Sequence, residues 1–306
     1  MAKQRSVRDL LRVRPLKGQL TLADIDPGST PDVRKRAARA DKDRDGEKLR
    51  QLQERLYAEG TRSLLLVLQG MDTSGKDGTI IHVIGAVDPQ GAQITGFKAP
   101  TAEERQHDFL WRIRKALPDH GMIGIFNRSH YEDVLIVRVR SLVPEAVWSK
   151  RYDEINRFER EVTAAGTTIV KICLHISFDE QRKRLLDRLM DPTKRWKFNP
   201  KDLEERERWP DYQVAYDAAL FRCSTDRAPW YVVPANKKWY RNWAITRILI
   251  ETLEEMDPRY PEPDLDIEAL TERLAPKTPR ATATRAPAPR RRVAPRRRVA
   301  PRRARA

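Results

Sequence analysis

The stretch RSLLLVLQGMDTSGKDGTIIHVIGAV, residues 62–87, decides the fold of this chain. It begins with an apolar run, continues through a loop that contains glycines, and ends with Ile80, Val83, Ile84 and Val87. The spacing of these four residues, i, i+3, i+4 and i+7, is typical of one buried face of a helix. We therefore predict a buried strand, a phosphate-binding loop and a helix, in this order.

The loop matches the pattern G-x-x-x-x-G-K at Gly70, Gly75 and Lys76, with Asp77 where serine or threonine is usual. The glycines let several N–H groups point into one concavity, and the helix adds the positive end of its dipole. We expect these residues to bind phosphate, with a chance match as the weaker alternative. Asp72 would repel phosphates unless a divalent cation lay between them, so we expect it to bind Mg²⁺, directly or through water, with Mn²⁺ as a substitute.

Length and composition narrow the class of protein. The 306 residues, 40% of them apolar, are enough for one sizeable core. The net charge is +16, but the segment from Lys277 holds twelve Lys and Arg and no acid, which leaves +4 for the rest. Cys173 and Cys223 indicate reduced packing residues rather than a disulfide framework. Without a bilayer-length apolar run or the apolar core of a secretory signal, we expect a cytoplasmic protein that contacts no membrane.

Strand and helix patterns alternate along the rest of the chain. The predicted strands are 92–97, 121–126, 168–176 and 230–233, and the predicted helices are 46–58, 101–117, 144–165, one starting at Ser177, and 242–256. Two segments, Thr101–Glu104 and Ser177–Glu180, have the S/T-x-x-E form of a capping box. The alternation indicates an α/β fold in three layers, with a five-stranded parallel sheet between helices.

The domain organisation follows from these patterns and from the charge distribution. We assign residues 1–45 to an N-terminal arm, 46–262 to the phosphate-binding domain, 263–276 to a connecting segment and 277–306 to a basic tail. Ten Lys and Arg between Arg182 and Arg208 predict a helical lid at about 182–209. The lid residues expected to bind phosphate are Arg188, Lys194, Arg195 and Lys197, while Lys237, Lys238 and Arg241 extend the basic rim.

A polar loop, NRSHYED at 127–133, follows the third predicted strand. In parallel sheets the chemistry lies at the carboxyl ends of the strands, so we expect this loop beside the phosphate-binding loop. Arg128 is a candidate for holding two oxygens of a phosphoryl group in transfer. Asn127 lies where many kinases with a phosphate-binding loop of this kind have a metal-binding aspartate.

Four further residues of this loop are candidates for the nucleotide side: His130, Tyr131, Glu132 and Asp133. His130 is either an acid or base or, more in keeping with phosphoryl transfer, a structural or stacking residue. The two carboxylates either position metal or substrate, or cap the next helix.

Four separated segments, GMDTSGKDGTI, FNRSHYEDVL, DPTKRWKFNP and APWYVVPANKKWYRN, together resemble the polyphosphate kinase 2 family over residues 13–260. The resemblance implies a P-loop kinase fold related to thymidylate kinase. It also implies transfer of the terminal phosphate of inorganic polyphosphate to a nucleotide, or the reverse, with Mg²⁺. In that family the loop around Asp72 and Lys76 holds polyphosphate, and the lid lines its channel.

The resemblance also bears on the substrate and on the partners. The asparagine at Asn127 is similar to the subgroup that phosphorylates both AMP and ADP, which puts a metal-ligand role at this position in doubt. The expected partners are polyphosphate and adenine or guanine nucleotides, and the chain is expected to form a homo-oligomer. The alternatives are a nucleic-acid-associated protein that acts through its basic tail, and an ATP-dependent nucleotide kinase.

The tail carries PRRRVA at Pro289 and again at Pro295, followed by PRRARA at Pro301. Proline and like charge oppose a packed core, so we expect disorder and a polyanionic partner.

Truncation after Pro276 tests the role of the tail, with DNA retention and the KM for polyphosphate as the two measurements. If DNA retention is lost and phosphotransfer is unchanged, the tail is an accessory polyanion-binding segment, because its charge contacts phosphates independently of sequence. A raised KM for polyphosphate would instead assign the tail to substrate capture. Full DNA retention by the truncated chain would contradict a nucleic-acid role.

Overall fold

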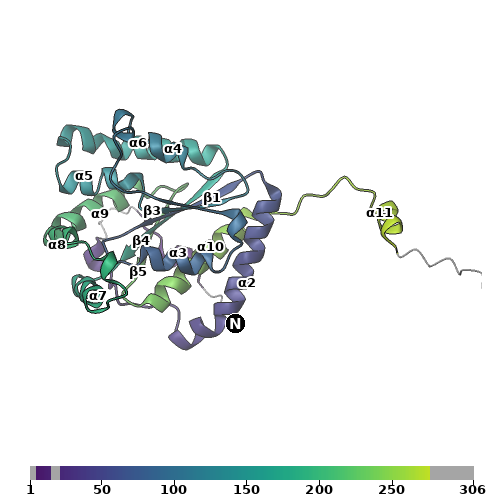
Figure 1. Cartoon of the computed structure of the whole chain (residues 1–306), viewed down its shortest axis with the longest axis horizontal. Helices are drawn as coiled ribbons and strands as arrows, with labels where there is room; N and C mark the ends of the chain where they lie inside the picture. Colours follow the sequence, from purple (N-terminus) through teal and green to yellow (C-terminus); the bar gives the residue numbers. More distant parts are fainter. Residues whose placement is uncertain (1–4, 15–20, 276–306) are drawn as a thin grey trace, which may run out of the picture. The chain divides into compact units, whose positions relative to one another are not determined.

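The computed structural model of the protein describes residues 5–14 and 21–275 (Figure 1). The chain divides into two compact units, Met1–Pro261 and Glu262–Ala306, a boundary one residue from the predicted one. The predicted connecting segment contains a helix, α11 (Ile267–Leu274), whose N-cap Asp266 accepts a hydrogen bond from the N–H of Ala269 at 2.9 Å. The predicted basic tail lies outside the described residues, so its disorder stays a prediction.

The first unit is built around a five-stranded sheet in which every pair of neighbouring strands is parallel, as predicted. The strands are β1 (Ser63–Gln69), β2 (Ala92–Gly96), β3 (Ile123–Asn127), β4 (Thr167–His175) and β5 (Trp230–Pro234). Their order is β2-β3-β1-β4-β5, so β1 lies between β3 and β4. The loop after β1 leads to a helix on one face of the sheet, and the loop after β3 leads to a helix on the other face. Both loops start at the carboxyl ends of neighbouring parallel strands, where such folds bind ligands.

Successive side chains of β1 enter two different cores. Leu64, Leu66 and Leu68 belong to one buried cluster, and Leu65 and Val67 belong to the other. This alternation explains the continuous apolar run, because a strand covered on both faces has no polar side. The sheet is therefore the middle layer of a three-layer α/β/α fold, as Figure 1 shows.

Each face of the sheet is covered by its own set of helices (Figure 1). One face carries α1 (Val7–Leu11), α2 (Lys35–Glu59), α3 (Lys76–Ile84) and α10 (Lys238–Met256). The other carries α4 (Trp111–Lys115), α5 (Ile136–Val139), α6 (Glu145–Ala164) and α9 (Trp209–Cys223). No helix in the described part of the chain is long and apolar enough to cross a membrane.

The predicted helix at 101–117 is wrong. The capping box forms, with Thr101 N donating to Glu104 Oε2 at 2.9 Å and Glu104 N to Thr101 Oγ1 at 3.2 Å. It starts only a 3-10 turn, Glu104–Gln106, before α4. Asp108 interrupts the helix because its carboxylate accepts from the N–H of Leu110 at 3.0 Å, which closes a separate turn.

Two other local predictions also need correction. The helix predicted at 46–58 begins at Lys35, so the predicted arm boundary falls inside α2. The second capping box is half formed: Ser177 Oγ accepts from the N–H of Glu180 at 3.1 Å, but Ser177 N donates to Asn236 Oδ1. The Glu180 carboxylate pairs with Arg184 at 2.7 Å instead, since an arginine one helical turn away is the stronger partner.

Candidate active site

The phosphate-binding loop joins β1 to α3 and has the turn that its glycines predict. Gly70 has a φ of 153° and Gly75 a φ of 110°, both in the region that favours glycine. A Cβ on Gly70 would lie 2.7 Å from the carbonyl oxygen of Leu174, so the loop packs directly against β4. Lys76 is buried, and its Nζ donates to the carbonyl oxygen of Gly70 at 2.7 Å. Burial and the charge of Arg128 lower the pKa of Lys76, an effect that a bound anion would oppose.

Arg184, on α7 (Phe178–Met190), hydrogen-bonds to the main chain of this loop. Its guanidinium donates at 2.6–3.1 Å to four main-chain carbonyl oxygens, those of Thr73, Ser74, Ala235 and Asn236. The contact joins the lid helix, the phosphate-binding loop and the segment after β5. Sequence reasoning placed Arg184 only in a basic helix and missed this role. The one local signal was its spacing from Glu180, four residues earlier.

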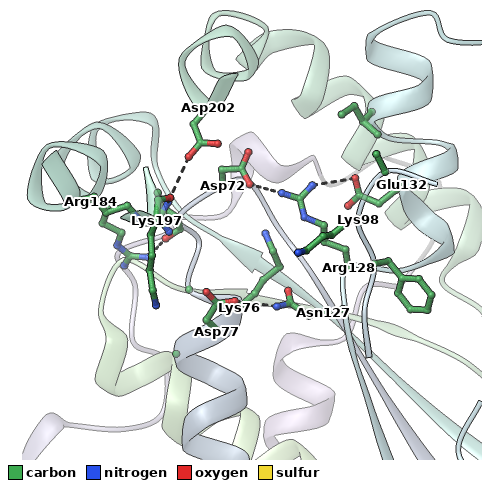
Figure 2. Close-up of a pocket in the computed structure, with 18 of the residues that line it drawn as sticks. Asp72, Lys76, Asp77, Lys98, Asn127, Arg128, Glu132, Arg184, Lys197 and Asp202 are labelled. Atoms are coloured by element: carbon green, nitrogen blue, oxygen red, sulfur yellow. Dashed lines mark hydrogen bonds and ion pairs between the residues drawn. The ribbon is translucent and has the colours of Figure 1, made fainter. Parts of the chain in front are cut away.

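Asp72 and Arg128 meet at the loop and form its central ion pair (Figure 2). Arg128 Nη2 donates to Asp72 Oδ1 at 2.7 Å, and its Nη1 to Glu132 Oε2 at 3.4 Å. Arg128 adopts a left-handed φ of 65°, and its N–H donates to the carbonyl oxygen of Leu68 at 3.1 Å. The charge of Glu132, followed by that of Asp72, raises the pKa of Arg128 although burial opposes it. The guanidinium is therefore a permanent cation held at the sheet edge.

Asn127 contacts the phosphate-binding loop from the end of β3. Its Nδ2 donates to Asp77 Oδ1 at 2.9 Å, and both side chains line the same cavity (Figure 2). The hydrogen bond ties β3 to the first turn of α3. The structure thus brings the second predicted loop beside the first, as the parallel sheet required.

His130 and Tyr131 do not line the cavity, so the structure does not support their predicted nucleotide-side role. They are 1% and 0% exposed. His130 Nε2 lies 3.3 Å from Glu159 Oε1, and Tyr131 Oη donates to the same oxygen at 2.8 Å. Lys171 Nζ donates to Glu159 Oε2 at 2.5 Å. The side chains of His130 and Tyr131 therefore belong to a buried charged cluster around Glu159. The structural alternative for His130 is the one that the structure supports.

The remaining two candidates, Glu132 and Asp133, do line the cavity. Neither caps α5, whose N-cap Leu135 has no side-chain cap bond. Asp133 accepts from Arg151 Nη1 at 2.8 Å, and burial raises its pKa to about 6. Their position on the nucleotide side therefore stays a prediction, whereas the capping alternative is wrong.

The lid consists of α7, a 3-10 turn (Arg195–Lys197) and α8 (Lys201–Glu207). Three of the four predicted phosphate-binding cations line the cavity: Arg188, Lys194 and Lys197. Arg195 is not among the lining residues, and its Nε donates to the carbonyl oxygen of Leu189 at 2.8 Å. Its phosphate contact stays a prediction. Arg188 is paired with Asp202 at 3.5 Å.

All these elements surround one cavity of about 930 Å³. Ten Lys and Arg and six Asp and Glu line it, an excess of positive charge that favours a polyanion. The lining also includes five apolar residues: Phe97, Pro100, Ile136, Val137 and Leu142. Figure 2 shows Asn127, Arg128 and Glu132 at one side of the loop, with Arg184 and Lys197 at the other.

The donor set at Asp72 fits a magnesium ion that is shared with substrate. In phosphate sites Mg²⁺ usually has one or two carboxylate ligands and takes the rest from phosphates and water. Asp72 lines the cavity, and its side chain is 22% exposed. Within residues 5–14 and 21–275, no group of three His, Cys, Asp or Glu side chains could hold a metal alone. A shared ion on Asp72 agrees with both observations.

Comparison with known proteins now identifies the family. The family model described as Polyphosphate kinase 2 matches residues 32–261. The chain belongs to the polyphosphate kinase 2 family. The matched range contains both active-site loops and the lid, and it confirms the resemblance carried by the sequence motifs.

Named relatives support the family assignment. The chain is 55% identical to the AMP/ADP-polyphosphate phosphotransferase of Meiothermus ruber over 217 residues, 71% of this chain and 81% of the relative. It is 48% identical to the ADP-polyphosphate phosphotransferase of Rhodopseudomonas palustris over 228 residues, 71% and 79% of the two chains. The crystal structure of polyphosphate kinase 2 from Arthrobacter aurescens TC1 is 48% identical, with a TM-score of 0.85 and coverage of 90% and 98%. The predicted P-loop kinase fold is thereby confirmed.

Replacing Arg184 tests whether its hydrogen bonds to the main chain stabilise the loop. Arg184→Met should lower the free energy of unfolding by about 2–4 kcal/mol, because buried carbonyl groups lose their donor. Urea denaturation followed by circular dichroism measures this change. Arg182→Met, an exposed position on the same helix, is the matched control and should change stability by less than about 0.5 kcal/mol. Equal effects of the two substitutions would contradict the role.

Proposed function

We propose that the protein transfers the terminal phosphate of inorganic polyphosphate to AMP or ADP, and that it also runs in reverse. This proposal rests on the cation-rich cavity around the phosphate-binding loop in a chain that belongs to the polyphosphate kinase 2 family. The relatives named as AMP/ADP- and ADP-polyphosphate phosphotransferases support the choice of donor and acceptors.

The proposed reaction is an in-line displacement between two phosphates. A phosphate oxygen of the nucleotide attacks the terminal phosphorus of polyphosphate, a new P–O bond forms, and the bond to the bridging oxygen breaks. That oxygen leaves on the shortened chain. Lys76, the amino end of α3 and Arg128 stabilise the charge that spreads over the transferred group. Because both phosphates are already ionised at neutral pH, the buried His130 is not needed as a base.

Magnesium completes this arrangement in the proposal, with manganese as a substitute. Asp72 would hold the ion, which when bound neutralises phosphate charge during transfer. Asp72 accepts from Arg128 and lines the cavity, so the carboxylate is available to an ion there. Asn127 supplies a neutral amide beside it and is not assigned as a ligand.

In this proposal the nucleotide base lies against the apolar residues of the cavity. A base, adenine or guanine, would contact Ile136, Val137 and Leu142, side chains that offer a surface to a flat aromatic ring. Lys98 lines the same cavity and lies near Arg128 in Figure 2, where it would contact the nucleotide phosphates. Polyphosphate would then extend along the lid side, and acceptor and donor would meet at Arg128.

Three further properties belong to the proposal. The protein is expected to act in the cytoplasm, to form a homo-oligomer, and to contact polyphosphate or nucleic acid through its basic tail. The charge of the segment after Lys277 supports the last of these.

The direct test combines protein, Mg²⁺ and long-chain polyphosphate with AMP, ADP, GMP or GDP, and detects the products by chromatography. Formation of ADP and ATP from AMP is the expected result. Product formation with ATP as the only accepted donor would instead support an ordinary nucleotide kinase and contradict the proposal.

Asp72→Asn should keep the fold and lower kcat at least about a hundredfold, because the amide removes the charge that holds the metal. Thermal denaturation should show an unchanged melting temperature, since asparagine can still accept from Arg128. The matched control is Asp153→Asn, an exposed carboxylate outside the cavity, which should leave kcat unchanged. A fully active Asp72→Asn protein would show that the metal is held elsewhere.

Asp202 predicts a pH dependence of polyphosphate binding. Burial, followed by the charge of Asp72, raises its pKa to about 6. As the pH falls through 6 the carboxyl becomes protonated, and Arg188 loses its charged partner and can turn to phosphate. Affinity for tripolyphosphate should therefore rise roughly two- to fivefold between pH 7 and pH 5. Titration calorimetry should show a smaller rise for Asp202→Asn, and an equal rise in both proteins would contradict the assignment.

A further inference from the structure

Arg241 is a buried cation at the amino end of α3. It lies on α10, and only 3% of its surface is exposed. Its guanidinium packs on the first turn of α3: a Cβ on Gly75 would overlap Arg241 Nη1, and one on Gly78 would lie 3.2 Å from Nη2. Arg241 also lines the cavity that contains the phosphate-binding loop. Glycine at both positions therefore leaves the space that this guanidinium occupies.

The charge of Arg241 has little compensation. Its Nε and Nη2 donate to Asn242 Oδ1, a neutral amide, at 3.0 and 2.7 Å. Among the residues that the structure describes, no carboxylate forms an ion pair with Arg241, and its Nη1 makes no hydrogen bond. Burial, followed by the charge of Arg184, lowers the pKa of Arg241 to about 10.

The two buried arginines beside the loop differ in this respect. Arg184 donates to four carbonyl oxygens and pairs with Glu180, so its charge is satisfied within the protein. Arg241 lies within the electrostatic reach of Arg184 and at the positive end of a helix, where a buried guanidinium is unfavourable. Such an arrangement is favourable when a ligand supplies the negative charge.

The topology places Arg241 on the opposite side of the loop from Arg128. Arg128 follows β3 and Arg241 follows β5, and these strands lie on opposite sides of β1 in the sheet. Within α3 the residues that contact Arg241, Gly75 and Gly78, lie three positions apart and share one helix face. Asp77 lies on another face and contacts Asn127.

We propose that Arg241 binds a phosphate of the donor that stays on the leaving polyphosphate chain, on the α10 side of the phosphate-binding loop. The inference rests on the proposed function, because it takes the transferred phosphoryl group to lie at Arg128. The remaining chain then crosses the amino end of α3 toward Arg241, and Lys238 lines the cavity on the same helix. Arg241 acts on binding of the donor and not on the nucleotide.

The test compares Arg241→Gln and Arg241→Lys with the unchanged protein. Arg241→Gln should raise the KM for polyphosphate roughly tenfold or more, because a charge-assisted contact with phosphate is lost. The KM for AMP and ADP should stay within twofold. Arg241→Lys should show a smaller rise, since it keeps the charge but loses the planar fork. The melting temperature of Arg241→Gln should be unchanged or higher, because an uncompensated buried charge is removed.

The matched control is Arg50→Gln, an arginine on α2 that is half exposed and paired with Glu47 and Glu54. It removes the same charge outside the cavity and should leave the KM for polyphosphate unchanged. Equal changes in KM for Arg241→Gln and Arg50→Gln would overturn the inference. So would a raised KM for nucleotide alone, or a melting temperature that falls together with activity.

A binding measurement separates this inference from the proposed function. Calorimetric titration of tripolyphosphate into the full chain needs no turnover, and Arg241→Gln should bind it roughly tenfold more weakly. If the unchanged protein binds tripolyphosphate more tightly than Arg241→Gln does but forms no ADP or ATP, the proposed function fails while the phosphate-binding role of Arg241 stands. Equal binding by the two proteins overturns the role of Arg241, whatever the activity.

Discussion

The loop at residues 70–76 can bind anions only if its N–H groups face the cavity while its carbonyl groups find donors elsewhere. Arg184 supplies donors to two of these carbonyl groups, those of Thr73 and Ser74. The same guanidinium bonds to the segment after β5, so one side chain sets the distance between the loop, the lid helix and α10. The positions of Lys76 and Arg241 in the cavity depend on this contact.

The charges around the cavity fall into compensated and uncompensated groups. Arg128, Arg188 and Lys194 each have a carboxylate partner that orients the side chain. Lys76 and Arg241 are buried and hydrogen-bond only to neutral groups, and burial lowers the pKa of both. A phosphate chain supplies what these two cations lack, which is why the excess of positive charge indicates a polyanionic substrate rather than a stabilising device.

The polar loop after β3 is anchored by the buried ion pair between Lys171 and Glu159, because His130 and Tyr131 of the loop contact Glu159. Desolvation opposes ionisation of Glu159, but Lys171 and His130 outweigh it and keep the pKa of the carboxyl low. Buried pairs of this kind contribute little net stability, yet they permit few alternative arrangements. Because His130 and Tyr131 are directed into this cluster, the next two residues of the 3-10 turn, Glu132 and Asp133, are directed to the cavity.

Much of the fold could be predicted from the order of the residues. The strand, loop and helix at 62–87, the parallel sheet and the meeting of the two active-site loops all follow from periodicity, glycine positions and alternation. The helix predicted at 101–117 failed because of a local turn at Asp108, whereas the polar loop depends on residues distant in the chain. The pattern at 130–133 marks a polar loop but does not show which side chains turn inward toward Glu159.

The roles of Arg184 and Arg241 required three-dimensional packing. Arg184 and Thr73 are 111 residues apart, and no local pattern specifies that contact. In the sequence Arg184 looks like one member of a basic helix, and Arg241 looks like one member of the basic rim. Local patterns depend on backbone geometry over a few residues, whereas burial and charge compensation depend on every segment that packs around a side chain. For that reason the sequence alone indicated a phosphate site. Only the tertiary structure showed which buried cations of that site have no carboxylate partner.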